Sequence, residues 1–259
     1  MTGEAALLAA LPAWSFAFVL LLARIGGAMA LLPGLGDNAL PAMVRAGLAL
    51  TVTLVLLPVI APQMPAPPEP GLQAAGMVAA ELVTGLWLGW LARLFTLALP
   101  LCAQFIAYLL GLATVLQPSS ELGPQTSALS RLFELVAPLV ILTSGLYALP
   151  LSALAGSYHL IPAGTLLPAG DGTALAVRAV GGMFALALRL AAPFLLAGIV
   201  WHVAIGLLAR LVPRIQVYFV AMPGQILGGL LLLAALSAVI LSAFLDAMRD
   251  GLSGLPGLG

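Results

Sequence analysis

The chain contains no lysine, one cysteine, two histidines and very few charged residues. A single thiol, Cys102, excludes a disulfide framework and a cysteine-based metal site. Neither His159 nor His202 has cysteine, histidine or carboxylate neighbours at the spacing of metal ligands. The formal net charge is zero, so the composition indicates no nucleic-acid partner. We therefore expect no metal and no cofactor.

What remains is mostly apolar. Hydrophobic residues make up 63% of the 259 residues, charged residues only 7%, and the mean hydropathy is +1.18. A water-soluble domain of this length needs about a quarter of its residues charged to cover its surface. The apolar runs have the length of helices, and no alternation of period two suggests a barrel. The sequence predicts an all-α, polytopic membrane protein built of helical hairpins, with helices broken by proline and glycine.

Six apolar runs are separated by segments rich in turn-forming residues, at 13–32, 45–62, 72–116, 128–151, 174–211 and 217–244. At about 20 residues per crossing, the run 72–116 is long enough for two crossings, with Pro100 as the joint or kink between them. The chain is thus expected to have six to seven spanning segments. Residues 152–172 are expected to form a long connection, and residues 246–259 a flexible tail.

One segment, 117–127, stands apart from its apolar surroundings. It holds two prolines, one glycine, the carboxylate of Glu121 and six amide or hydroxyl side chains. Polar, helix-breaking backbone between membrane-length runs is either a water-exposed connection or the lining of a cavity enclosed by protein. We favour the second interpretation, because Val115, Leu116 and Leu122 can form an apolar constriction that resists wetting.

Seven charged side chains lie within or at the edges of the apolar runs: Arg24, Glu81, Arg93, Arg131, Glu134, Arg178 and Arg189. A charged side chain at the bilayer centre costs at least about 2.5–3.5 kcal/mol. Five arginines and two glutamates cannot all pair with one another. Each is interpreted as snorkelling to an interface or as a charged contact inside a protein assembly. A proton relay is disfavoured, because arginine does not release its proton. Arg131 and Glu134, three residues apart, can also pair on one helix face.

Glycines form small-residue notches suited to close helix contact, at Gly26-Gly27, at Gly85 with Gly89, at Gly181-Gly182 and at Gly228-Gly229. Whether these contacts lie within the chain or between subunits stays open. The turn carrying Arg210, Pro213 and Arg214 is expected in the cytoplasm, by the positive-inside rule.

No catalytic motif is present, so the sequence does not predict an enzyme. A secondary transporter with a small-molecule site between broken helices is an alternative. No repeat symmetry and no central acidic cluster support it.

Several of these features occur together, in order, between residues 14 and 245. The first linker is spanned by four residues, Arg24, Pro33, Pro41 and Arg45. Gly111 precedes the polar central loop, and that loop leads into residues 131–134. Residues 145–147 lead to 156–164, and residues 206–213 lead to 217–223. In this order the chain resembles the FliR/SctT-type proteins, the R component of the flagellar and virulence type III secretion export gate.

The resemblance implies a non-enzymatic pore subunit in the bacterial inner membrane, in a flagellar or injectisome basal body. Its implied partners are P-type and Q-type gate subunits, a B-type switch subunit, exported proteins and lipid. Residues 1–259 would form one membrane domain, with a P-like part at 13–173, a plug loop at 112–127 and a Q-like hairpin at 174–245.

The resemblance also implies roles for individual residues. Those implied in the pore plug are Gly111, Val115, Leu116, Gln117, Pro118, Glu121, Leu122, Gly123 and Pro124. Those implied in charged assembly contacts are Arg24, Arg45, Glu81, Arg93, Arg131, Glu134, Arg178 and Arg189.

Overall fold

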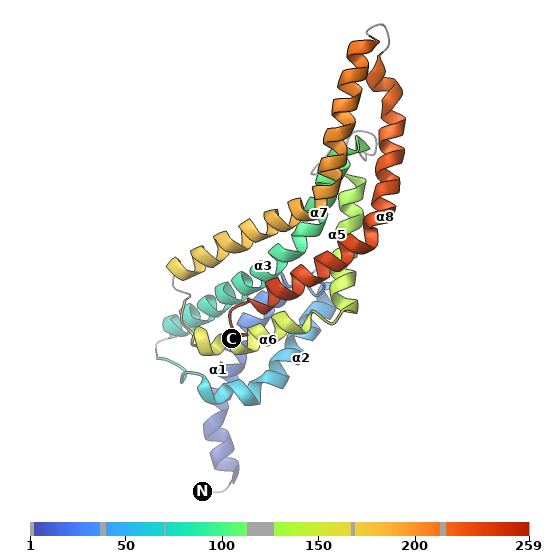
Figure 1. Ribbon diagram of the computed structural model, residues 1–259. Helices are drawn as coiled ribbons and strands as arrows, with labels where there is room; N and C mark the ends of the chain where they lie inside the picture. The colour runs from blue at the N-terminus through green and yellow to red at the C-terminus, as the bar shows by residue number, and fades with distance from the viewer. Residues whose placement is uncertain are drawn as a thin grey trace. The chain divides into compact units, whose positions relative to one another are not determined.

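The computed structural model describes residues 3–36, 40–69, 71–112, 127–166, 169–212 and 216–258, and every regular element among them is helical (Figure 1). The elements are α1 (Gly3–Met29), α2 (Ala42–Ile60), the 3₁₀ helix η1 (Ala61–Gln63), α3 (Gly71–Leu109), α5 (Ala128–Thr143), α6 (Ala148–Leu160), α7 (Ala169–Leu211) and α8 (Val217–Ser253). Five helices are long and apolar enough to cross a membrane, or up to six if α5 and α6 form one span. The prediction of an all-α, multi-pass protein is confirmed for these residues.

The upper predicted count of seven spans is not reached, because α3 is one helix. Of the two alternatives for Pro100, a joint between two separate crossings is wrong, because the 39 residues of α3 continue through it as one helix. Pro193 likewise lies inside α7, and Pro223 lies inside α8. A proline removes one backbone hydrogen bond, whereas ending a helix in apolar surroundings would expose several more polar groups. The helices therefore contain proline without being broken by it.

Three helices are longer than the apolar layer of a bilayer. At about 1.5 Å per residue, α3, α7 and α8 measure about 58, 64 and 56 Å, against roughly 30 Å of hydrocarbon. Part of each helix must therefore be covered by protein, headgroups or water.

Two further expectations are corrected in the later half of the chain. The run 128–151 is divided into α5 and α6 at Gly145, whose φ of +76° suits glycine, and α6 continues to Leu160. His159 therefore lies on a helix and not in a connection.

Residues 246–253 are the last turns of α8, where a flexible tail was expected. Phe244, Met248 and Leu252 recur every four residues and are fully buried, so an apolar stripe extends the helix.

The chain forms two compact units. Unit 1 comprises Met1–Phe95, Ile141–Ala179 and Asp250–Gly259, and unit 2 comprises Thr96–Val140 and Val180–Arg249. Helices α3, α5, α7 and α8 each contribute residues to both units.

Glycines bring α1 against α3 in unit 1. A Cβ built on Gly85 of α3 would overlap the carbonyl oxygen of Arg24, and one on Gly27 of α1 would lie 2.7 Å from the carbonyl oxygen of Leu82. Gly89 meets the Ala28 backbone in the same way. We call Gly27, Gly85 and Gly89 the glycine notch. Its predicted packing role is confirmed, and the contact lies within the chain.

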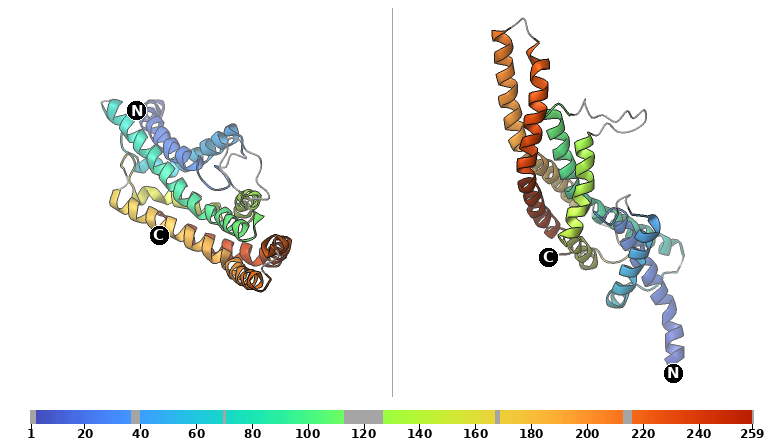
Figure 2. Two further views of the ribbon diagram at one scale, coloured as in Figure 1. Left: turned by 90° about the horizontal axis from the view of Figure 1, so that it is seen from above. Right: turned by 90° about the vertical axis from the view of Figure 1, so that its right-hand side faces the viewer.

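In unit 2, the end of α7 and the beginning of α8 run side by side as a helical hairpin (Figures 1 and 2). The fully buried side chains of this unit include Leu99 and Ile106 of α3 and Phe244 of α8. The hairpin also carries many exposed apolar side chains, among them Leu196, Val200, Leu207 and Leu231.

Replacing Gly85 with alanine is expected to destabilise the protein by about 1–3 kcal/mol, because the new methyl group overlaps the backbone of α1. Gly76→Ala in the same helix is the matched control, since nothing lies within 4 Å of a Cβ at Gly76. That control should be neutral or slightly stabilising, because alanine favours helix. The thermal unfolding midpoints of the purified proteins test this. Equal midpoints for the two variants would contradict the notch.

Candidate functional site

A buried ion pair joins α1 to α3 in unit 1. The Nε of Arg24 lies 2.6 Å from Glu81 Oε2, and its Nη2 donates to Glu81 Oε1 at 2.9 Å. Both side chains have 0% exposure. Two parallel hydrogen bonds between a guanidinium and a carboxylate form the strongest geometry of this pair.

The remaining donors of Arg24 reach α6 and the residue that follows it. Nη1 donates to Ser157 Oγ and to the Ile161 carbonyl oxygen, both at 3.1 Å, and Nη2 also donates to Ile161 at 3.1 Å. The guanidinium carbon lies 3.8 Å from the centre of the Tyr158 ring, a cation–π contact. Arginine has five N–H donors, and the five hydrogen bonds account for all of them.

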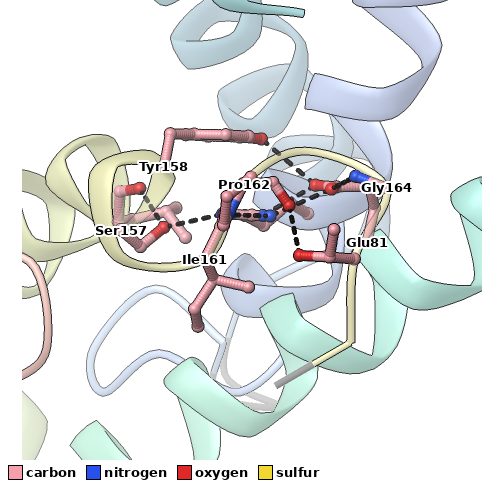
Figure 3. A network of polar contacts seen from close by, with 9 residues as sticks. Glu81, Ser157, Tyr158, Ile161, Pro162 and Gly164 are labelled. Carbon is pink, nitrogen blue, oxygen red and sulfur yellow. Dashed lines mark hydrogen bonds and ion pairs between the residues drawn. The ribbon is translucent and has the colours of Figure 1, made fainter. Parts of the chain in front are cut away.

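Glu81 is satisfied by two further groups (Figure 3). The Gly164 N–H donates to Oε1 at 2.7 Å, and the Tyr158 hydroxyl donates to Oε2 at 3.4 Å. Gly164 adopts a φ of +78°, which suits glycine and aims its amide at the carboxylate. We call Arg24, Glu81, Ser157, Tyr158, Ile161 and Gly164 the buried network. Its polar groups bind one another, so its effect is to fasten α1, α3 and α6 together.

The network corrects the prediction for two residues. Arg24 and Glu81 were expected to contact other subunits, but both are buried and paired with each other. The pairing was missed because the residues are 57 positions apart and no local spacing connects them.

The other predicted charged residues are more accessible. Arg131 and Glu134 form the predicted ion pair at 2.8 Å on the exposed face of α5. Arg45 donates to the Gly36 carbonyl oxygen at 3.3 Å, and Arg93 is half-buried on α3.

Arg178 and Arg189 are exposed on α7, and neither has an ion-pair partner within the described part of the chain. Their role as assembly contacts stays a prediction.

The predicted plug lies mostly outside the described residues: Val115, Leu116, Gln117, Pro118, Glu121, Leu122, Gly123 and Pro124. Gly111 is described, with a φ of +71° just after α3. Of the predicted cytoplasmic turn, Arg210 is exposed on α7, while Pro213 and Arg214 also lie outside the described residues.

The helix ends on either side of this segment are each held by an amide side chain in unit 2. At the end of α3, Gln225 Nε2 donates to the Leu109 carbonyl oxygen at 2.7 Å. At the start of α5, the Ser127 N–H and hydroxyl donate to Gln104 Oε1 at 3.0 and 2.9 Å. Ser130 N–H donates to Ser127 Oγ at 3.1 Å, which caps the helix. Isolated amides in apolar runs are the sequence signal that could have indicated Gln104 and Gln225.

Comparison with known proteins gives a family and a consistent set of relatives. The family described as "Bacterial export proteins, family 1" matches residues 15–251. The "Flagellar biosynthetic protein FliR" of Caulobacter vibrioides is 30% identical over 231 residues, covering 89% of this chain and 92% of the relative. The protein of the same name from Escherichia coli is 27% identical over 247 residues, and that from Bacillus subtilis is 26% identical over 231 residues. These matches cover 91% and 86% of this chain, and 92% and 87% of the relatives, respectively.

The costs of removing the two partners of the buried pair should not add, because each partner compensates the charge of the other. Arg24→Met or Glu81→Leu is expected to cost about 3–5 kcal/mol, because each leaves a buried charge without its partner. The double variant should cost clearly less than the sum. Heat unfolding of the purified proteins gives the double-mutant cycle.

The exposed pair of α5 provides the control for this cycle. Glu134→Ala breaks the ion pair with Arg131 and is expected to change stability by no more than about 1 kcal/mol. Additive costs for Arg24 and Glu81 would show that the two side chains do not depend on each other.

Proposed function

Because the chain belongs to family 1 of the bacterial export proteins, we propose that it is a subunit of a flagellar protein-export gate in the bacterial inner membrane. The proposal is supported by relatives named flagellar biosynthetic proteins, which match about nine-tenths of the chain. Five helices long and apolar enough to cross a membrane fit a multi-pass protein. The subunit acts without enzymatic chemistry.

The single observation that carries the proposed mechanism is the position of the polar segment between two anchored helix ends. Gln225 binds the last residue of α3, and Gln104 binds Ser127 directly before α5. We infer that residues 112–127 form a plug that closes a protein-conducting pore. A closed state favoured by a few kcal/mol leaves the open state at about 0.1–10%.

The proposed assembly places this chain beside P-type and Q-type subunits and a B-type switch subunit. Residues 13–173 take the place of a P-like part, and residues 174–245 form a Q-like hairpin. The pairing of α7 with α8 and the exposed apolar side chains of both helices support this division, because a hairpin of this kind needs neighbours or lipid. Arg178 and Arg189 are proposed to meet acidic groups of a neighbouring subunit.

Deleting Pro118–Pro124 is expected to leave the complex assembled but make the inner membrane permeable to ions and small solutes. The physical reason is that the deletion removes Leu122 from the apolar constriction and shortens the backbone that fills the pore. Ion leakage in cells, measured beside the amount of complex recovered by co-purification, tests this.

The control is a deletion in another proline-rich segment. Ala66 and Pro67 are exposed between η1 and α3, and a surface connection tolerates small deletions. Their removal should leave the membrane tight. A tight membrane with the Pro118–Pro124 deletion, at a normal amount of complex, would show that the segment is only a connection.

A further inference from the structure

The end of α3 is held in part by a side chain of the hairpin. The last four carbonyl groups of a helix have no partner within that helix. Leu110 N–H donates to Ile106 at 2.9 Å and Gly111 N–H donates to Tyr108 at 3.2 Å, which satisfies two carbonyl oxygens at this end. Gln225 of α8 donates to a third, that of Leu109, at 2.7 Å.

A second hydrogen bond fixes which way the Gln225 amide points. Trp201 Nε1 of α7 donates to Gln225 Oε1 at 3.2 Å. An indole N–H only donates and a carbonyl oxygen only accepts, so the amide oxygen must face Trp201 and the NH₂ group must face Leu109. The chain Trp201–Gln225–Leu109 therefore has one orientation, and it includes both helices of the hairpin.

Two glycines of the hairpin allow it to pack closely against the same end of α3. A Cβ on Gly229 would overlap the side chain of Leu110, and one on Gly198 would lie 3.2 Å from Leu109 Cδ2. A cavity of about 100 Å³ lies beside the contact, lined by Leu109, Phe194, Gln225 and Leu232 among others. The hydrogen bond of Gln225 therefore lies within a close contact between the hairpin and α3, and a small cavity adjoins that contact.

The other side of the segment 113–126 is held differently. Gln104, which binds Ser127, and Pro100, whose carbonyl oxygen accepts from Ser130 Oγ at 2.9 Å, both belong to α3. None of these contacts involves α7 or α8. These hydrogen bonds join the start of α5 to α3, whereas the hydrogen bond of Gln225 joins the end of α3 to the hairpin.

We propose that Gln225, oriented by Trp201, is a positioning residue that couples the α7–α8 hairpin to the end of α3, from which the pore-closing segment starts. This rests on the proposed function of that segment. The hairpin then sets the point and direction at which the chain leaves α3. A rearrangement of the hairpin during export would be transmitted through this hydrogen bond and through the close contacts of Gly198 and Gly229 beside it.

The test compares three variants of the full chain in the intact complex. Gln225→Leu removes the bond to Leu109, and the adjoining cavity accommodates the altered side chain. Trp201→Phe keeps an aromatic side chain but removes the indole N–H donor together with the second ring of the indole. Ser237→Ala is the matched control on α8, because that exposed hydroxyl binds only the Ala234 carbonyl oxygen of its own helix.

Two readouts are measured for each variant: hydrogen exchange of the Leu110 and Gly111 amides, and ion leakage across the inner membrane. Gln225→Leu is expected to speed exchange about tenfold and to make the membrane leak at a normal amount of complex. Trp201→Phe should have a smaller effect of the same kind, and Ser237→Ala none. If Gln225→Leu lowers the amount of complex, Trp201→Phe decides by the same readouts.

Exchange no faster than in Ser237→Ala would overturn the positioning role. Faster exchange with a tight membrane, while the Pro118–Pro124 deletion leaks, would overturn the coupling to pore closure. If the membrane stays tight in the Pro118–Pro124 deletion strain, the proposed function of the segment is wrong. The exchange rates alone would then show whether Gln225 holds the end of α3.

Discussion

The structure of unit 1 depends on the fully buried ion pair between Arg24 and Glu81. Removing two ions from water costs free energy. Such a pair is tolerated only when its geometry is good and further hydrogen bonds satisfy every remaining donor and acceptor. Here all five donors of the guanidinium are used, and each carboxylate oxygen accepts a second bond from α6 or from Gly164. That requirement fixes α1, α3 and α6 together. The ion pair requires the glycine notch, because the missing side chain of Gly85 allows α3 to pack directly against the backbone of Arg24.

Unit 2 meets the same requirement with neutral groups. Its polar contacts join helix ends, with Gln225 on the Leu109 carbonyl oxygen, Gln104 on Ser127 and Ser130 on the Pro100 carbonyl oxygen. Burying a polar group without a partner costs free energy in an apolar protein as it does in a bilayer. In unit 2 a few polar side chains therefore determine what the end of α3 and the start of α5 contact. This concentration of polar contacts around the segment 113–126 is why we place the functional site there.

Local patterns predicted the features that depend on local physics. Composition predicted the membrane class, the notch spacing of Gly85 and Gly89 predicted close packing, and three-residue spacing predicted the pair of Arg131 with Glu134. Contacts between distant residues were not predictable in this way. Arg24 and Glu81 were individually identified, but their pairing depends on how α1 packs on α3. Pro100 was over-interpreted, because one missing hydrogen bond is a smaller penalty than ending a buried apolar helix. The helical residues 246–253 were missed because the glycines and proline beyond them outweighed the stripe of Phe244, Met248 and Leu252.

The central claim is that this chain closes a pore from within an assembly. Its most direct test is a reconstruction by electron cryo-microscopy of the complex purified through this chain from its native membrane. The account predicts a single copy of the chain, with residues 113–126 lying across a central channel and the exposed sides of α7 and α8 facing other subunits or lipid. A complex without a central channel, or one in which residues 113–126 face the surrounding detergent, would contradict it.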